Sequence, residues 1–305
     1  MIVRRAHSLG LAVLLAAAGL CASGPAFAGP IVLLRSGDLA PYRAAEEGLR
    51  AATHEPVVVI EVSSGTPDQV AHAVLALHPD AVVAVGLRAA MLGRDYLPHV
   101  PIVYCAVPRP EHYDLIGDWL TGVRSDVDPA AEVAALRLAY PSVKSVGYLC
   151  GAEADPSVIR HARAAARAAG LNFVEARLAT ASELTAVTRR VAPGVDAFWM
   201  PADPLVATPE GFRFLLEFSL SSRKPLLAFS DALVRKGALV AVMPDYVEAG
   251  TLAAQQVRRI RAGDRPVDLP VPAVARMRTI MNQATARALG AALTATAVRA
   301  AEVVP

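Results

Sequence analysis

The chain has 305 residues, 54% of them apolar, a mean hydropathy of +0.39 and a formal net charge of +2. This length allows two lobes or one large α/β domain, and the apolar content excludes disorder over most of the chain. The charges form neither a basic stripe nor a Lys/Arg block, so they give no support to nucleic-acid binding.

The N-terminal segment 1–28 reads as a cleaved export signal. Arg4 and Arg5 form a positive region, Leu9–Leu20 is an apolar run, and Ala26-Phe27-Ala28 is a small-x-small cleavage site. We therefore expect a mature periplasmic chain that starts near Gly29. The apolar run is too short for a comfortable transmembrane helix, so no stable membrane insertion is expected. Cleavage removes both arginines and leaves 28 basic and 28 acidic residues.

The three cysteines leave alternatives open. Cys21 would accept a lipid anchor only if a small residue preceded it, and Leu20 stands there. Cys105 and Cys150 each end a predicted strand, and an oxidising compartment would allow them to pair. The alternatives are a disulfide that restrains the lobes and two reduced, half-buried thiols.

Short apolar strands alternate with amphipathic helical stretches along the chain, which predicts parallel sheets covered by helices on both faces. The predicted strands are Ile31–Arg35, Val57–Val62, Ala81–Val85, Ile102–Ala106, Ser145–Leu149, Asn172–Ala176, Ala197–Met200, Leu226–Phe229 and Leu239–Met243. The predicted helices are Pro41–Thr53, Pro67–Leu77, Ala130–Tyr140, Pro156–Ala169, Ala181–Val191, Pro209–Ser222 and Tyr246–Ala262.

These elements form two βα blocks, from Ile31 to about Val107 and from about Ser145 to Ser230. The segment 108–122 between them reads as an irregular connection, and 261–273 as a proline-rich connector. The Ala-rich tail after Gly290 is expected to fray. Tyr104, Phe198 and Trp199 are expected in the core.

Parallel sheets bind ligands beyond the carboxyl ends of their strands. The loops at these ends read RSGDLAP, VGLRAA, CAVPRPE, CGAEADPS, PADPLVA and FSDALV. Each holds small residues, and most add one or two polar groups. This composition suits a small polar ligand held by backbone N–H groups, hydroxyls and a few charges.

Signatures of enzyme chemistry are missing from the sequence. It has no Gly-x-Ser-x-Gly elbow, phosphate loop or Gly-x-Gly-x-x-Gly turn, and no His-x-x-x-His, Glu-x-x-His or Cys-x-x-Cys pair in the mature chain. We therefore expect a protein that is not an enzyme and carries neither a cofactor nor a metal site.

Several segments resemble the periplasmic substrate-binding proteins of ABC transporters, in particular the TrpX-like family. They are TGV (121–123), YPSVKSVGYL (140–149), VDAFWMPADPLV (195–206), the long segment 224–271 that begins KPLLAFSDALV, and MNQATARALG (281–290). The resemblance covers most of the mature chain and is strongest from Tyr140 onward. It implies the class I binding-protein fold, in which two Rossmann-like lobes are hinged around a central ligand cleft.

Two loops of the first lobe depart from the family pattern. Gly86-Leu87-Arg88 stands where relatives often carry a Gly-Thr-Pro-like turn that suits a ligand carboxylate. Relatives often have Asp-Pro in the segment that reads VPRPEHYDL here. The hypothesis for this chain is that Arg88 or Arg109 meets an anionic group of the ligand.

Asp203 stands between two prolines after a predicted strand of the second lobe. Two interpretations are open: the carboxylate binds a ligand ammonium or hydroxyl, or it caps or braces the helix that follows. The other candidates have similar alternatives. Ser36 is a ligand donor or a turn residue, and Ser230 and Asp231 bind ligand or cap a helix near Ala232.

Tyr246 is a further candidate, at a hinge or the cleft rim, and Glu153 lies in the CGAEADPS loop. The expected lobes are 29–116 with about 241–267, and 117–240 with about 268–305. The resemblance implies a monomer that captures a small-molecule ligand, an amino acid or related small organic molecule, between its lobes and delivers it to an inner-membrane ABC permease. The alternative is a periplasmic sensor that presents its ligand-bound form to a membrane receptor.

Overall fold

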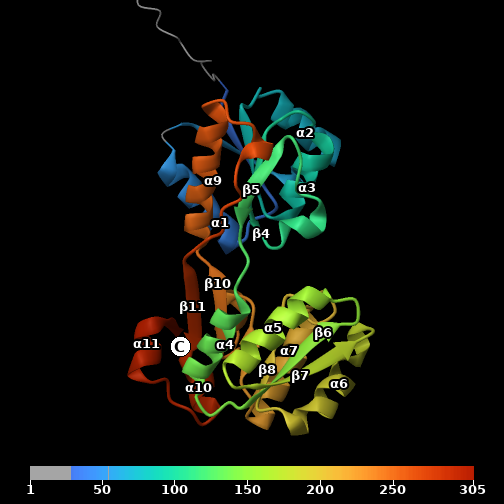
Figure 1. Cartoon of the computed structure of the whole chain (residues 1–305), viewed down its shortest axis with the longest axis vertical. Helices are drawn as coiled ribbons and strands as arrows, with labels where there is room; N and C mark the ends of the chain where they lie inside the picture. The colour runs from blue at the N-terminus through green and yellow to red at the C-terminus, as the bar shows by residue number, and fades with distance from the viewer. Residues whose placement is uncertain (1–28, 54) are drawn as a thin grey trace, which may run out of the picture.

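The structure is a computed structural model, and it describes residues 29–53 and 55–305. The predicted export signal lies outside the described residues. The chain forms two α/β lobes, stacked along the long axis of the molecule (Figure 1). This confirms the predicted fold class. No helix in the described part is long and apolar enough to cross a membrane.

The first lobe has a parallel five-stranded sheet in the order β2-β1-β3-β4-β5. Its strands are β1 (Ile31–Arg35), β2 (Val57–Glu61), β3 (Ala81–Val85), β4 (Ile102–Val107) and β5 (Leu120–Arg124). Its helices are α1 (Ala40–Ala52), η1 (Val62–Ser64), α2 (Pro67–Leu75), α3 (Leu87–Tyr96), η2 (Pro110–Tyr113), α9 (Tyr246–Arg261) and η5 (Pro266–Asp268). Helices α1 and α9 cover one face of the sheet, and α2 and α3 cover the other.

The second lobe has a seven-stranded sheet in the order β12-β11-β10-β9-β8-β6-β7, in which only the β10–β11 pairing is antiparallel. Its strands are β6 (Ser145–Gly151), β7 (Asn172–Leu178), β8 (Ala197–Trp199), β9 (Leu226–Ala228), β10 (Val240–Pro244), β11 (Met277–Asn282) and β12 (Glu302–Val304). Its helices are α4 (Pro129–Ala139), α5 (Pro156–Ala168), η3 (Ala181–Glu183), α6 (Leu184–Val191), η4 (Ala192–Gly194), α7 (Pro209–Ser222), α8 (Asp231–Arg235), α10 (Gln283–Ala288) and α11 (Ala295–Ala300).

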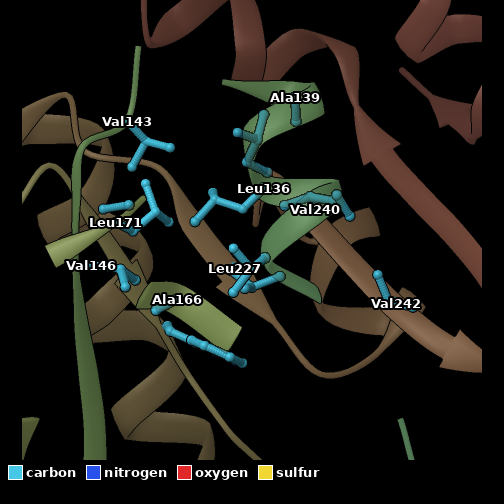
Figure 2. Close-up of a cluster of buried hydrophobic side chains, with 14 of the residues drawn as sticks. Leu136, Ala139, Val143, Val146, Ala166, Leu171, Leu227, Val240 and Val242 are labelled. Atoms are coloured by element: carbon cyan, nitrogen blue, oxygen red, sulfur yellow. The ribbon is translucent and has the colours of Figure 1, made fainter. Parts of the chain in front are cut away.

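Each face of the second sheet has its own core. Figure 2 shows the core beneath α4 and α5, where Leu136 of α4 and Ala166 of α5 pack with Leu227 and Val240 of the sheet. Helices α6, α7 and α8 cover the opposite face. Tyr104, Phe198 and Trp199 are at most 1% exposed, which confirms their predicted place in the core.

Three expectations from the sequence need correction. Segment 108–122 contains η2 and the start of β5, because Leu120–Arg124 pairs with β4. Helix α3, which reads LRAAMLGRDY, was not among the predicted helices. The tail after Gly290 does not fray: it forms α11, whose Ala297 is fully buried, and β12, which pairs with β11.

The lobe boundaries also shift. Residues 120–124 add β5 to the first sheet, and 240–244 add β10 to the second, the reverse of the predicted assignment. Ala273 bridges to Arg124, so the first lobe extends past 267. The chain thus passes between the lobes after β5, after β10 and before β11.

Candidate ligand-binding site

The carboxyl ends of both parallel sheets point toward the opposite lobe. Strand β5 runs parallel to β4, and its carboxyl end continues into α4 of the second lobe. Strand β10 runs parallel to β9, and its carboxyl end leads into α9, which packs on the first lobe. Loops that follow the strands therefore lie on two facing edges, where ligands of open α/β sheets bind.

The first-lobe edge brings Ser36, Gly86 and Tyr42 into contact. Gly86 has a φ of +86°, and a Cβ there would lie 2.6 Å from Tyr42 Cζ and 2.7 Å from Ser36 Oγ. A glycine is therefore required both for the left-handed backbone and for the space. Ser36 is only 8% exposed, and its Oγ accepts a hydrogen bond of 2.9 Å from the backbone N–H of Ala89.

This edge offers donors to an anion. Gly86 precedes α3, and the first N–H groups of a helix have no acceptor within the helix. Arg88 in the first turn is exposed and lies close enough to influence Tyr42. Burial raises the pKa of the Tyr42 hydroxyl, and the Arg88 guanidinium opposes that rise. The hydroxyl therefore stays protonated near neutral pH.

Tyr246 connects this group to the second lobe. It follows β10 and packs against buried clusters of both lobes. Burial raises its pKa to about 12, and Tyr42 and Asp231 add to the rise. Asp231 begins α8, where its Oδ1 accepts from the N–H of Ala232 at 2.8 Å. Ser230 is the N-cap of α8, but within the described residues its side chain makes no capping bond.

Arg109 lies at a second point where the lobes approach each other. Strand β4 changes register between Tyr104 and Val107, and Ala106 there has a φ of +54°. Arg109 also has a positive φ of 48°, and its N–H donates to Asp126 Oδ1 at 2.8 Å. Such bulges and left-handed residues redirect the chain near functional sites.

Two side chains beside Arg109 join the lobes directly. His112 Nε2 of η2 lies 2.9 Å from Oδ2 of Asp155, the N-cap of α5. Hydrogen bonds from Ser157, with smaller contributions from His112 and Arg109, lower the pKa of Asp155. The carboxylate is therefore charged at neutral pH.

Beneath this point, Trp199 Nε1 donates to Glu132 Oε1 at 3.3 Å. Burial raises the pKa of Glu132 to about 8. Part of the residue is still exposed to solvent. Tyr148 packs edge-on against Trp199, with ring centroids 5.2 Å apart.

Asp203 accepts two backbone hydrogen bonds within its own lobe. Its Oδ2 accepts from Gly151 N–H at 2.8 Å and its Oδ1 from Leu205 N–H at 2.9 Å. These bonds tie the loop after β8 to the end of β6. The following helix, α7, is capped by Thr208 and not by Asp203, so the structure shows Asp203 as a loop brace, and the ligand interpretation stays a prediction. Glu153 is exposed and lies near Arg177.

The thiols lie deeper than expected. Cys105 and Cys150 are both buried and unpaired with each other, which corresponds to the reduced alternative. Burial raises the pKa of Cys105 to about 12 and that of Cys150 to about 11. Neither thiol is therefore ionised at neutral pH.

Sequence reasoning missed Tyr42, His112, Asp155 and Glu132. Two of them carried a usable signal. Tyr42 follows Pro41 in the first turn after β1, and Asp155 precedes Pro156 as a helix cap would. Glu132 and His112 reach their places only through the packing of α4 and η2, which a strand-end rule does not cover.

Two α/β lobes with three connections and with polar loops on facing edges are an architecture that hinged solute-binding proteins share with other two-lobed proteins. The chain belongs to the ABC transporter substrate binding protein family, whose model matches residues 42–304. Proteins of this family bind substrates and are not enzymes.

Individual relatives are distant. The chain is 21% identical over 218 residues to a tyrosine-binding protein of Clostridioides difficile strain R20291, and it spans 63% of that protein's length with 69% of its own. An ABC domain in complex with L-Trp from Streptococcus pneumonia is similar, with a TM-score of 0.66, 23% identity, and coverage of 90% of this chain and 100% of that one.

A ligand-free, open substrate-binding protein with adhesive properties from Clostridium difficile is also similar, with a TM-score of 0.76 and 19% identity. That comparison covers 90% of this chain and 99% of the other. At these identities, the solved structures establish the shared fold.

Proposed function

We propose that this chain is the exported solute-binding component of an ABC importer. It captures a small polar ligand with an anionic group between its lobes and delivers that ligand to an inner-membrane permease. Hinge closure follows from tighter binding of the ligand in the closed arrangement.

The observation that carries this proposal is the donor group around Gly86. A buried serine, the hydroxyl of the half-buried Tyr42, a helix N-terminus and Arg88 converge on one edge that points at the other lobe. A carboxylate there would receive charge-assisted hydrogen bonds, which are about twice as strong as neutral ones. Tyr246 and Asp231 supply a hydroxyl and a carboxylate from the opposite side.

The ligand class follows from this pairing of charges. An anionic group faces Arg88 and the start of α3, and an ammonium or hydroxyl faces Asp231. An amino acid or a related small organic acid carries both groups. The relatives named for tyrosine and for L-Trp favour an amino acid, and the Tyr42 and Tyr246 rings provide an apolar surface beside the donors.

A thermal-shift screen of the chain that begins at Gly29 tests the capture step. The library holds amino acids, including tryptophan and tyrosine, with small organic acids, nucleosides and sugars. A ligand that binds only the folded chain stabilises it by about 2.7 kcal/mol at a hundredfold excess over Kd. A hit confined to uncharged sugars or nucleosides would contradict the anionic ligand.

Arginine variants test the site itself. We expect Arg88→Ala to weaken binding of the hit about tenfold to a hundredfold, with little change in the melting temperature of the ligand-free chain. Arg50→Ala is the matched control, because Arg50 lies in the last turn of α1 and pairs with Glu46. Equal affinities of the two variants would remove Arg88 from the site.

Arg109→Ala tests the second hypothesis, that Arg109 meets an anionic group of the ligand. Arg109 lies near Asp155, so its loss weakens binding only if the ligand reaches the point where His112 and Asp155 meet. Delivery requires its own assay: uptake of the ligand by vesicles that contain the cognate permease. Capture without stimulated uptake would favour the sensor function.

A further inference from the structure

A buried charge cluster lies at the amino edge of the first sheet, opposite the candidate ligand site. Arg261, the last residue of α9, has a side chain only 11% exposed. Its Nη2 donates to the carbonyl oxygen of Gly29 at 2.7 Å and lies 3.1 Å from Asp80 Oδ2. Its Nη1 pairs with Glu55. Asp80 is also largely buried, with 14% of its side chain exposed.

The cluster is incomplete in charge and in hydrogen bonds. One guanidinium faces two carboxylates, that of Glu55, whose side chain is 46% exposed, and that of the largely buried Asp80. Within the described residues, the buried Nε of Arg261 has no hydrogen-bond partner, and the buried Oδ2 of Asp80 has only its ion-pair contact with Arg261 Nη2. Buried charges without full partners are costly, so a further cation at this point would be stabilising.

Gly29 is placed to supply that cation. Residue 31 of β1 pairs with residue 81 of β3, so Gly29 and Asp80 lie side by side just before these strands. A Cβ on Gly29 would be 2.3 Å from the carbonyl oxygen of His78 and 3.3 Å from Asp80 Oδ1. Only glycine fits so tightly. The backbone nitrogen of Gly29 already forms a hydrogen bond with Asp80.

We propose that, once the chain is cleaved at the Ala28–Gly29 bond expected from the sequence, the new α-ammonium of Gly29 completes the cluster as the partner of Asp80. Hydrolysis by an export-pathway peptidase adds water across this bond. Ala28 leaves as a carboxylate, and the Gly29 nitrogen becomes an ammonium. Before cleavage the same nitrogen is a neutral amide, so processing itself adds an ion pair that ties together β1, β3 and α9.

The inference rests on the proposed export of the chain, but it is independent of the ligand. Its first test is the intact mass of protein recovered from the periplasm, which should correspond to a chain that starts at Gly29. A different first residue, including a lipid-modified Cys21, would overturn the proposal and leave ligand capture unaffected.

A double comparison tests the pairing. One chain begins at Gly29 and the other at Phe27, and each carries Asp80 or the Asp80→Asn substitution. The chain from Phe27 keeps the Gly29 nitrogen as an amide. We expect it to melt roughly 2–4 °C below the chain from Gly29 when Asp80 is present. With Asp80→Asn, the two lengths should melt together. The same difference in both backgrounds would overturn the pairing.

Two further measurements test the Gly29–Asp80 ion pair without relying on the Asp80→Asn substitution alone. Asp118→Asn is the control, because this carboxylate is 78% exposed and the effect of chain length should persist in it. NMR titration of the chain from Gly29 reports the α-amino group directly. Its pKa should lie clearly above the usual 7.7–8.0 for an α-amino group. A value within or below that range would contradict the ion pair.

Discussion

Asp203 is a carboxylate whose two oxygens each accept one backbone N–H, from Gly151 and Leu205. Its removal leaves both N–H groups without this acceptor in a half-buried loop. We expect Asp203→Ala to lower the free energy of unfolding by about 1–3 kcal/mol, measured by urea denaturation of the ligand-free chain. An unchanged midpoint would show that the side chain serves the ligand alone.

Glu132 makes the stability depend on pH in an unusual direction. Its pKa is 4.5 in the unfolded chain and about 8 in the folded one. Between these values the folded chain binds more protons, so stability falls as pH rises from about 4.5 to about 8 and then levels off. We expect Glu132→Gln to be more stable than the natural chain at pH 8 by about 1–3 kcal/mol, since the side chain is only half-buried.

The pH profile distinguishes this cause from better packing. The gain of Glu132→Gln should shrink as pH falls and vanish near pH 4.5, where the natural carboxyl is protonated in both states. A gain of equal size at all pH values, measured by chemical denaturation, would contradict the raised pKa. The bond from Trp199 is kept, because a glutamine carbonyl also accepts it.

At the residue scale, candidate site residues could be predicted where a small or polar residue directly follows a predicted strand. Ser36 and Gly86 follow β1 and β3, and the structure places them in contact. The sequence did not show which residue each of these side chains contacts in the folded chain. Asp203 turns to Gly151, and the contact of Tyr42 with Gly86 depends on how α1 packs beside β3.

Helices α1 and α9 pack through backbone contact at two glycines. A Cβ on Gly48 would lie 1.9 Å from the carbonyl oxygen of Val247, and one on Gly250 would lie 1.9 Å from that of Ala45. No side chain can move aside to relieve these contacts. We expect Gly48→Ala to destabilise the chain by about 2 kcal/mol, the cost of overpacking reduced by the helix preference of alanine.

The control is Gly194→Ala, since nothing lies within 4 Å of a Cβ at that position. Its effect should stay within about 0.5 kcal/mol. Thermal or urea denaturation of both variants makes the comparison. Equal stability of Gly48→Ala and the natural chain would show that the helices can separate at no cost.

Elements with strong apolar periodicity were predictable, and elements defined by distant partners were not. Strand β5 reads LTGVR, with too few apolar residues to be distinguished from a loop, and its place comes from pairing with β4. Strand β12 reads EVV, and it forms because β11 offers it an edge. Local sequence carries no record of either partner.

At the scale of the whole molecule, the predicted lobe boundaries were wrong at strands whose place depends on distant partners. The strands that enter a connection, β5 and β10, each belong to the lobe they leave. From the sequence, the lobes were separated where the composition changes. In the structure, a strand belongs to the lobe whose sheet it is hydrogen-bonded to. The repetition of βα units still predicted the two lobes, because each unit buries its apolar face within its own sheet.

The pair of His112 and Asp155 links the lobes across the facing edges, at 2.9 Å. The contact joins η2 of the first lobe to the N-cap of α5 in the second lobe. The pKa of Asp155 is lowered, so its carboxylate remains charged at pH 6. We expect small-angle X-ray scattering of the ligand-free chain at neutral pH to show a broader range of lobe arrangements for His112→Ala than for the natural chain, because the variant loses this contact.

Asp155→Asn supplies the control for this whole-molecule effect, because it removes the charge that attracts His112 while Ser157 keeps a polar neighbour. This variant should show the same broad range of arrangements as His112→Ala. An exposed ion pair contributes only about 0.2–1 kcal/mol, so the populations should shift by no more than about fivefold. Identical scattering of the natural chain and His112→Ala would mean that the connections alone, and not this pair, set the lobe arrangement before the ligand binds.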